Sequence, residues 1–407
     1  MEWKEVRLGD VCDLIAGFAF KAKDFGEFPT KVIKIGDIKP PFVDYVGQVG
    51  VDISNYDINR LSKYTVKYGD YVLAMTGATI GKVGKYISEN FSYINQRVLK
   101  FSPKQNVDAD YINYIICSNK FAKYVVNYVD SESAQPNISA PTISKFAFQI
   151  PKDKGNQRRI ASVLSSLDRK IELNNKINAD LEEMAQAIFK NWFVDFEPFK
   201  DGKFVDSELG MIPEGWRVGT LGEFCKCLLG GTPSRSKEEY WNGEINWINS
   251  GEINKFRILE ASEKITELGL AKSATKLLPK KTTVLAITGA TLGQVSLLEI
   301  DSCANQSVIG VLENAEVPYE YIYPFIKDRI EMLIQHQTGG AQQHINKDNV
   351  ESLIFLFPTK NVLKDYISLV RPMYKRIESL CFENLYLSLL RDTLLPRLMS
   401  GEIEIPE

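Results

Sequence analysis

The chain has 407 residues, 44% hydrophobic and 25% charged, with 49 Lys and Arg against 52 Asp and Glu and a formal net charge of −3. This composition is typical of a globular protein large enough for two or more cores, and it excludes a disordered chain and a strongly basic, nonspecific nucleic-acid binder. No apolar run reaches bilayer length, and Met1-Glu2-Trp3-Lys4 opens on charges without an apolar signal segment, so we expect a cytoplasmic protein without membrane contact.

The first predicted domain spans residues 1–151 and alternates short apolar runs with turn residues. Strands are predicted at Val32–Ile35, Tyr71–Met75 and Phe146–Ile150, and a helix at Asp110–Val125. Between them, Gly77-Ala78-Thr79-Ile80-Gly81-Lys82 resembles a phosphate-binding loop, but that motif needs one more residue before Gly-Lys and a Ser or Thr after it. A β-turn between two strands is the better interpretation.

A long helix is predicted over residues 155–196. Its core positions recur every seven residues, at Ile160, Leu167, Asn174, Leu181 and Ile188. Thirty-five helical residues extend about 50 Å, and such a helix cannot bury its apolar stripe alone. We therefore expect a partner helix, with Asn174 helping to fix the register even if it faces Leu-rich sequence around Leu380.

A linker over residues 197–215 leads to a second domain, residues 216–358, which repeats the first. Gly77–Gly81 recurs as Gly289–Gly293, and other pairs lie in order on both sides. These pairs are Trp3 and Trp216, Asn95-Gln96 and Asn305-Gln306, Tyr111-Ile112 and Tyr321-Ile322, and Ala134-Gln135 and Ala341-Gln342. Strands are expected at Ile245–Ile248, Thr283–Ile287 and Leu353–Phe357, and a helix at Glu320–Ile334. A duplicated domain predicts a pseudo-twofold molecule that performs a paired task.

The final predicted element is a second long helix over residues 362–401. Its seven-residue positions are Tyr366, Met373, Leu380, Leu387 and Leu394. Each long helix follows its own domain, so a pseudo-twofold relation makes the two helices pair as an antiparallel coiled coil. Pro372 predicts a kink or a late helix start, and Pro396 predicts fraying of the last turn. The fold class is α+β, with two mixed α/β, mostly β domains on this helix pair.

Charge and metal-ligand residues give weaker signals. Residues 1–150 carry 18 Lys and Arg against 16 Asp and Glu, a balance of +2, and residues 213–357 carry 14 against 18, a balance of −4. Neither domain is basic overall, so DNA contact would need local clusters such as Lys21 with Lys23; a solvated face is the alternative. Only two His, His336 and His344, and six scattered Cys are present, so no metal site and no catalytic nucleophile with a partner is expected.

Several stretches in order along the chain resemble the specificity (S) subunits of Type I restriction-modification systems. They are Thr76-Gly77-Ala78-Thr79 with Asn95-Gln96, Leu167-Asp168 with Ile171, Ser207–Trp216, Leu221-Gly222-Glu223, Gly230–Ser234 and Leu395–Ile403. The resemblance implies two target-recognition domains that each read one part of a split DNA sequence, with the helices setting the spacing. It implies two methylation subunits and two restriction subunits as partners, which use S-adenosylmethionine, ATP and Mg, while this chain is non-catalytic and binds no cofactor.

Candidate DNA-binding residues follow from the groove chemistry, because Arg and Lys suit guanine and Asn and Gln suit adenine. Matching loops and polar segments of the two domains supply them. The candidates are Lys21, Lys23, Gln135 and Asn137 in the first domain, and Arg235, Lys237, Gln342, Gln343 and His344 in the second. The alternative function is a non-catalytic scaffold with two protein-binding domains on a coiled coil, which would lack salt-sensitive DNA affinity.

Overall fold

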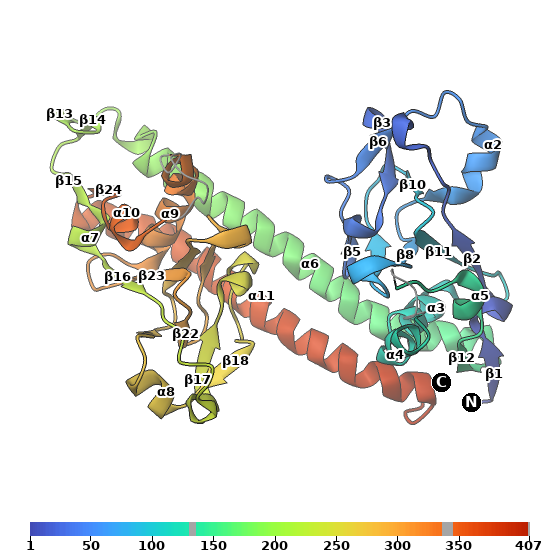
Figure 1. The fold of residues 1–407 in the computed structure, drawn as a ribbon. Helices are drawn as coiled ribbons and strands as arrows, with labels where there is room; N and C mark the ends of the chain where they lie inside the picture. The colour runs from blue at the N-terminus through green and yellow to red at the C-terminus, as the bar shows by residue number, and fades with distance from the viewer. Residues whose placement is uncertain (130–135, 336–344, 406–407) are drawn as a thin grey trace. The chain divides into compact units, whose positions relative to one another are not determined.

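A computed structural model describes residues 1–129, 136–335 and 345–405. The chain divides into two compact units. Unit 1 comprises Met1–Lys170 and Leu387–Glu407, and unit 2 comprises Ile171–Tyr386. Each unit therefore contains one β-rich domain together with a stretch of both long helices, which are drawn in green and red in Figure 1.

Unit 1 contains three groups of hydrogen-bonded strands. β1 pairs with β12, four strands follow the order β6-β3-β10-β7, and six follow the order β2-β11-β8-β9-β5-β4. The strands are β1 (Trp3–Arg7), β2 (Cys12–Ala16), β3 (Phe25–Ile33), β4 (Ile38–Lys39), β5 (Phe42–Val43), β6 (Val49–Val51), β7 (Thr65–Val66), β8 (Tyr71–Ala74), β9 (Val83–Tyr86), β10 (Ser92–Ile94), β11 (Val98–Pro103) and β12 (Ala147–Pro151). The three strands predicted in this domain correspond to β3, β8 and β12, with boundaries shifted by up to several residues.

Unit 2 repeats this topology with two differences: its counterpart of the six-stranded sheet has four strands, and β13 and β14 form an additional antiparallel pair. β15 pairs with β24, and the four-stranded sheets follow the orders β18-β17-β22-β19 and β16-β23-β20-β21. The strands are β13 (Phe204–Ser207), β14 (Gly210–Pro213), β15 (Arg217–Thr220), β16 (Lys226–Leu229), β17 (Trp241–Ile248), β18 (Glu263–Ile265), β19 (Leu277–Leu278), β20 (Thr283–Ala286), β21 (Val295–Leu297), β22 (Ser302–Ala304), β23 (Val308–Leu312) and β24 (Ile354–Phe357). The parallel pair β3·β10 of unit 1 has its counterpart in the parallel pair β17·β22. The internal repeat seen in the sequence is thus a repeat of strand order and direction.

The shorter helices differ between the repeats at one place. The helix predicted over Asp110–Val125 is two helices, α3 (Ala109–Ile116) and α4 (Asn119–Asn127), because the Ser118 hydroxyl accepts a hydrogen bond from the Phe121 amide and starts a new helix. Its counterpart in unit 2 is the single helix α9 (Tyr319–Gln335). The others are α1 (Leu8–Val11), α2 (Ile58–Leu61), α5 (Ala140–Ser144), α7 (Leu221–Phe224), α8 (Glu267–Ala271) and α10 (Lys347–Glu351).

The two long helices are α6 (Lys154–Phe193) and α11 (Lys360–Ser400). The expected late start at Pro372 is wrong, because α11 begins at Lys360 and continues through the exposed proline, with Val370 and Tyr374 buried on its other side. The expected fraying at Pro396 is also wrong, since Leu398 and Met399 lie in the core of unit 1. Burial of neighbouring side chains offsets the hydrogen bond that each proline removes.

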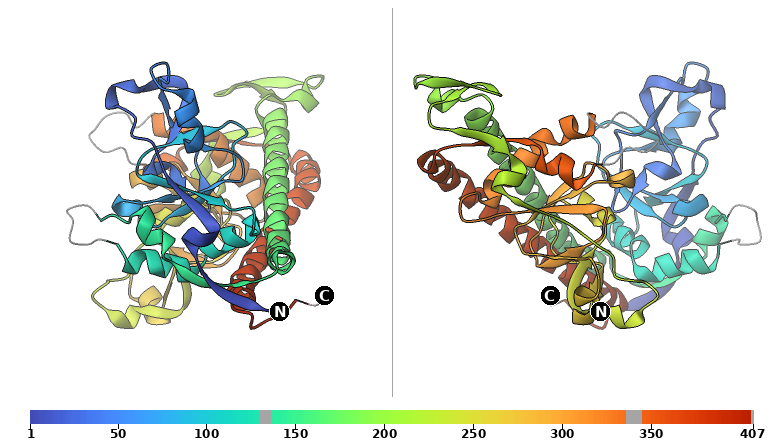
Figure 2. Two further views of the ribbon diagram at one scale, coloured as in Figure 1. Left: turned by 90° about the vertical axis from the view of Figure 1, so that its right-hand side faces the viewer. Right: turned by 60° about the vertical axis from the view of Figure 1, so that its left-hand side comes forward.

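Within each unit, α6 and α11 run side by side in opposite directions (Figures 1 and 2). In unit 2, Asn174 meets Asn384, whereas Phe193, further along α6, meets Tyr366, earlier in α11, edge to face. In unit 1, Asp168 pairs with Arg391 at 2.8 Å. The antiparallel pairing predicted from the repeat is confirmed.

Asn174 lies in the seam and is fully buried, at 0% exposure. Its Nδ2 donates hydrogen bonds to Glu383 Oε2 and to Asn384 Oδ1, both at 2.9 Å, so it meets polar partners rather than Leu-rich sequence. The seam also departs from a strict seven-residue repeat. Ile160, Tyr366 and Leu380 are buried like Asn174, but the other seven-residue positions are only partly buried: Leu167, Leu181, Ile188, Met373, Leu387 and Leu394. A nearly straight helix with 3.6 residues per turn drifts away from a 3.5-residue seam, and buried positions such as Ala185 and Phe189 follow that drift.

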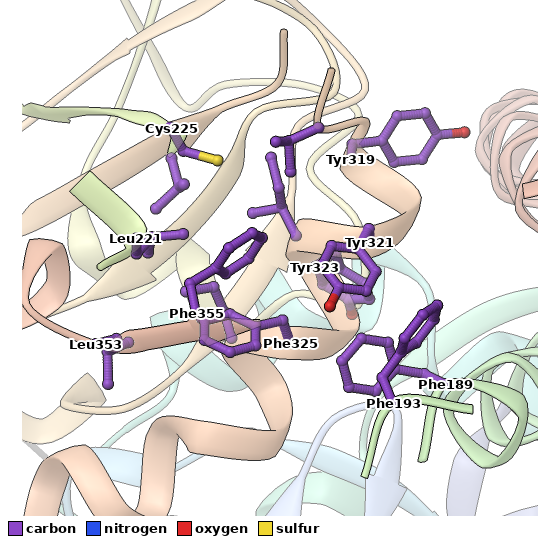
Figure 3. Close-up of a cluster of buried hydrophobic side chains, with 14 of the residues drawn as sticks. Phe189, Phe193, Leu221, Cys225, Tyr319, Tyr321, Tyr323, Phe325, Leu353 and Phe355 are labelled. Atoms are coloured by element: carbon purple, nitrogen blue, oxygen red, sulfur yellow. The ribbon is translucent and has the colours of Figure 1, made fainter. Parts of the chain in front are cut away.

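The largest core of unit 2 joins α6 to the second β-rich domain. Figure 3 shows Phe189 and Phe193 of α6 beside Tyr321 and Phe325 of α9 and Phe355 of β24. Phe193 and Tyr321 meet edge to face with their ring centroids 4.7 Å apart. Apolar burial at about 25 cal/mol per Å² makes such a cluster a strong attachment of the domain to the helix.

Candidate nucleic-acid interface

The glycine turns shared by both copies are built alike. The 3-10 turns Gly77–Thr79 and Gly289–Thr291 follow β8 and β20. Each turn begins at a glycine with positive φ and is followed by another: Gly77 (+73°) and Gly81 (+82°) in the first copy, and Gly289 (+72°) and Gly293 (+83°) in the second. Only glycine adopts these angles without strain. The turns connect antiparallel strands, as predicted, and the resemblance to a phosphate-binding loop has no structural support.

Equivalent backbone hydrogen bonds surround each turn. In unit 1 the Met75 amide donates to the Arg97 carbonyl at 2.9 Å, and the Ile138 amide donates to the Met75 carbonyl at 3.0 Å. In unit 2 the Ile287 amide donates to the Ser307 carbonyl at 3.0 Å, and the Ile345 amide donates to the Ile287 carbonyl at 3.0 Å. We call these matched segments the reading frame. It places Arg97 and Ser307 at equivalent backbone positions.

The first loop of each copy begins at a glycine that must be a glycine. A Cβ on Gly17 would lie 2.2 Å from the Asn95 carbonyl oxygen, and a Cβ on Gly230 would lie 2.1 Å from the Asn305 carbonyl oxygen. The two loops thus leave the frame at the same point. This explains why Lys21 and Lys23 in one copy correspond to Arg235 and Lys237 in the other.

The side chains in these loops have different surroundings. Lys21 and Lys23 are exposed, and the Lys21 amide donates to the Tyr56 hydroxyl at 3.2 Å. Arg235 forms an ion pair with Glu263 and lies 3.7 Å above the centre of the Trp241 ring. The hydrogen bond from Arg235 to Glu263 raises the pKa of the guanidinium, and the carboxylate compensates its charge.

Lys237 completes the pair of loop cations in unit 2. Its Nζ donates to the Tyr240 hydroxyl at 3.1 Å, and this hydrogen bond raises the pKa of the lysine. Arg235 and Lys237 are therefore held by aromatic side chains and a carboxylate, whereas Lys21 and Lys23 are the more accessible candidates for phosphate contact.

Of the other predicted DNA-binding residues, Gln135, Gln342, Gln343 and His344 lie outside the described residues. Asn137 is described: it is exposed and forms an isolated antiparallel bridge with Thr76. Asn137 and Thr76 line a pocket of about 560 Å³. The pocket thus lies between Met75 and Arg97 of the reading frame and Asn137, the described candidate residue of the first domain's polar segment.

The sequence reasoning missed Arg97, which lines the same pocket beside Gln96. Asn95-Gln96 and Asn305-Gln306 are identical in the two copies, but the next residue differs: it is Arg97 in one copy and Ser307 in the other. The signal that could have found Arg97 is a difference beside a repeated motif.

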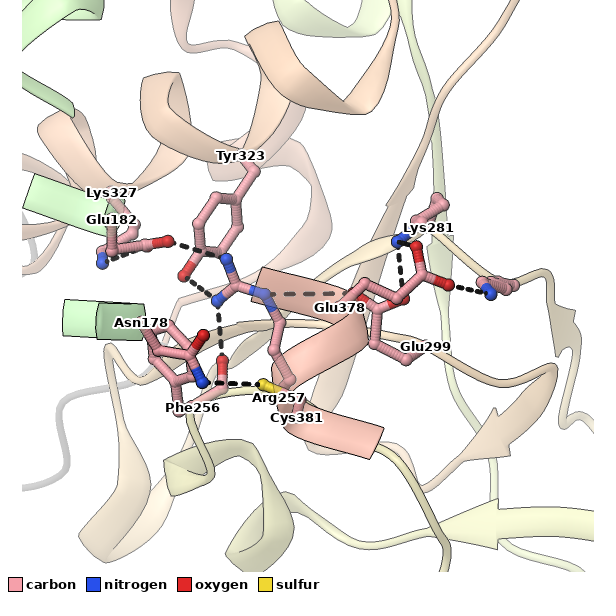
Figure 4. A network of polar contacts seen from close by, with 11 residues as sticks. Asn178, Glu182, Phe256, Arg257, Lys281, Glu299, Tyr323, Lys327, Glu378 and Cys381 are labelled. Atoms are coloured by element: carbon pink, nitrogen blue, oxygen red, sulfur yellow. Dashed lines mark hydrogen bonds and ion pairs between the residues drawn. The ribbon is translucent and has the colours of Figure 1, made fainter. Parts of the chain in front are cut away.

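A second feature missed from the sequence is a buried polar network in unit 2 (Figure 4). The Arg257 guanidinium, 1% exposed, donates to Glu182 Oε2 of α6 at 2.7 Å and to the Tyr323 hydroxyl at 3.0 Å. Lys281 forms ion pairs with Glu299 at 2.5 Å and with Glu378 of α11 at 3.0 Å. The network fastens the second β-rich domain to both long helices.

This network also includes two members of a group of four lysines that lie close together in the sequence of the second domain. Of Lys272, Lys276, Lys280 and Lys281, the last two pair with Glu378 and so form intramolecular contacts. Local charge in the sequence does not identify which lysines remain available.

No cluster of three or more His, Cys, Asp and Glu suited to a metal ion occurs in the described ranges, and no helix in them could span a membrane. Five of the six cysteines are buried, and burial raises the pKa of the Cys12, Cys225 and Cys227 thiols to about 12. Such thiols are protonated at neutral pH and are poor nucleophiles.

A model of the Type I restriction modification DNA specificity domain matches residues 1–183 and 213–369. The chain belongs to this family. Both copies of the reading frame fall within the two matched segments. The unmatched sequence between these segments contains β13 and the start of β14.

Two specificity subunits of Type I restriction enzymes are similar over much of the chain. The MjaIX specificity subunit of Methanocaldococcus jannaschii is 28% identical over 342 residues, covering 83% of this chain and 78% of the relative. The HindI specificity subunit of Haemophilus influenzae is 25% identical over 469 residues, covering 99% of this chain and 100% of the relative.

A solved structure of a Type I restriction-modification S subunit from M. genitalium has the same fold, with a TM-score of 0.57 at 13% identity, covering 98% of this chain and 96% of that one. For this specificity-domain chain, the expected fold class is confirmed: two mixed α/β domains and two long antiparallel helices.

Proposed function

We propose that this chain is the DNA-recognition subunit of a Type I restriction-modification complex, in which each β-rich domain reads one half of a split target. The observation that carries the proposal is the repeated reading frame, which has equivalent backbone hydrogen bonds in both copies but different side chains at Arg97 and Ser307. A common frame with different side chains suits two domains that recognise different bases.

The two long helices have a separate role in this proposal. They set the distance between the half-sites and provide the surface on which two methylation subunits dock, with two restriction subunits in the full complex. Support comes from the length of α6 and α11, 40 and 41 residues, which corresponds to about 60 Å each. Methyl transfer and cleavage belong to the partners, which require S-adenosylmethionine, ATP and Mg, and this chain supplies none of that chemistry.

The test is a methylome, read by single-molecule sequencing, of the strain that carries the gene. Deletion of the gene should abolish one split methylated motif, and its return should restore the motif. If deletion removes no motif although the methylation subunit is expressed, the proposal fails. A chain that binds the methylation subunit but gives no salt-sensitive DNA affinity would instead support a protein scaffold.

Two variants test the assignment of domains and loops. Gln342→Ala with Gln343→Ala should change only the half-site read by the second domain, because both residues belong to that copy. The paired variant Lys21→Ala with Lys23→Ala should weaken methylation without changing the motif, as expected for phosphate contacts. A change in both half-sites from the glutamine variant would contradict the assignment of one domain to one half-site.

A further inference from the structure

The end of the reading frame in unit 1 carries an arginine with no counterpart in unit 2. The Arg97 carbonyl accepts a hydrogen bond from the Met75 amide, and the Ser307 carbonyl accepts the equivalent hydrogen bond from the Ile287 amide. The two side chains therefore leave the frame from the same backbone position. A fixed backbone with a variable side chain suits a residue that determines specificity rather than fold.

The Arg97 side chain is available for a ligand. It is exposed, and within the described part of the chain it makes no hydrogen bond or ion pair. By contrast, Arg235, Arg257 and Arg391 each pair with a carboxylate. With no acceptor for it among the described residues, the Arg97 guanidinium beside the pocket suits an external acceptor.

The pocket that Arg97 lines contains no carboxylate among its described lining residues. Its polar groups are the amides of Gln96 and Asn137 and the hydroxyls of Thr76 and Ser139. The Thr76 hydroxyl is buried and lacks a hydrogen-bond partner within the described residues. The pocket thus offers a cation, two amides and hydroxyls, which is a donor-rich surface for an acceptor-rich ligand.

This set matches the edge of a base pair in the major groove. The guanidinium presents two parallel N–H groups that fit guanine O6 and N7, while Gln and Asn amides pair with neighbouring bases. Ser307, at the equivalent position of unit 2, has a short hydroxyl that cannot make the bidentate contact. We propose that Arg97 is a specificity-determining residue of unit 1 and reads a guanine in its half-site, an inference that rests on the proposed function.

The experiment compares methylomes of strains that carry the wild-type gene, Arg97→Ala and Arg97→Gln, each with the cognate methylation subunit. The wild-type half-site read by unit 1 should contain one invariant G·C pair. Arg97→Ala should relax preference at that pair alone by about 10- to 100-fold. Arg97→Gln should shift the base preference at that pair toward A·T, since the amide suits adenine. This second variant still tests the inference if the Arg97→Ala protein accumulates poorly.

Arg7→Ala is the matched control, because Arg7 is also an exposed arginine of unit 1 but lies in β1 and does not line the pocket. It should leave the motif unchanged. An unchanged motif in both Arg97 variants would overturn the inference while leaving the proposed function intact. A uniform loss of methylation at all sites without a broadened motif would also overturn it, because that result indicates a phosphate contact. If the wild-type gene itself yields no motif, the proposed function fails instead.

Discussion

Arg257 donates a hydrogen bond to Glu182 across 2.7 Å, although one residue lies in a loop of the second β-rich domain and the other in α6. Glu182 also accepts a hydrogen bond from Lys327 of α9 at 2.9 Å, so three segments of unit 2 meet at one carboxylate. Attachment of the domain to the helix therefore combines an apolar core with a buried charge cluster.

Removing Arg257 should destabilise unit 2 strongly. In Arg257→Met, Glu182 remains buried with only part of its compensating charge, and breaking such a pair costs about 3–5 kcal/mol. Urea unfolding followed by tryptophan fluorescence is a suitable measurement, since Trp192, Trp216, Trp241 and Trp247 all lie in unit 2. Arg376→Met, at an exposed position of α11, is the control and should change the midpoint little. Equal midpoints for the two variants would contradict a stabilising role.

Acid should weaken the same attachment. Burial alone would raise the pKa of Glu182, but the charges of Arg257 and Lys327 outweigh it and hold the pKa below the ordinary 4.5. A carboxylate with a lowered folded-state pKa contributes stability that is complete above about pH 4.5 and is lost as the pH falls through the folded-state value. Glu299 opposes this trend, because burial raises its pKa.

The measurement is therefore a difference between variants. The unfolding midpoint of Glu182→Gln should be lower than that of the wild type at pH 7, and it should fall less steeply below pH 4.5. Glu183→Gln, exposed on the same helix, should follow the wild-type curve. Parallel wild-type and Glu182→Gln curves below pH 4.5 would exclude Glu182 as a source of the acid sensitivity.

Alanine should not be tolerated at Gly17. The added Cβ would lie 2.2 Å from the Asn95 carbonyl oxygen and 2.4 Å from that of Ile94, so backbone must shift. Overpacking of this kind costs about 1–3 kcal/mol. We therefore expect the amides of unit 1 to be less protected from hydrogen exchange in Gly17→Ala than in the wild type. Gly36→Ala is a matched control in the same unit, because nothing lies within 4 Å of its Cβ. Equal protection in both variants would mean that the close approach at Gly17 is not required.

The long helices should determine the gap in the target. One heptad inserted in α6 beside Asn174, with a matching heptad in α11 beside Asn384, adds about 10 Å of helix, or about three base pairs of rise. The methylome should show a longer gap between unchanged half-sites. Insertion of the same residues in the 197–215 segment is the control. If the motif keeps its original gap after the helix insertions, the helices do not set the spacing.

The regular elements were largely predictable because they are local and repeated. Strands such as β8 and β20 carry apolar runs bounded by turn glycines, and the duplication made each copy support the other. The break between α3 and α4 was missed because a single serine cap decided it. The partial burial of Leu181 and Ile188 was missed because packing of the domain on α6, rather than a heptad, selects its buried face.

The candidate site was less predictable. The matching origin of the loops with Lys21 and Arg235 could be read from the repeat, but the ion pair of Arg235 with Glu263 joins residues 28 positions apart. Arg257 and Glu182 are separated by 75 positions. Pairings at such distances depend on the folded chain, so charge alone could not separate available cations from those already compensated.

Unit 1 is assembled from two segments that are far apart in the chain. Its core holds Leu8 and Phe148 together with Leu398 and Met399, while Trp3 packs against Gly401. During synthesis the ribosome makes all of unit 2 before it makes Leu387–Glu407. The first domain to be translated is therefore the last to complete its core, and until then it exposes apolar surface that favours binding by chaperones.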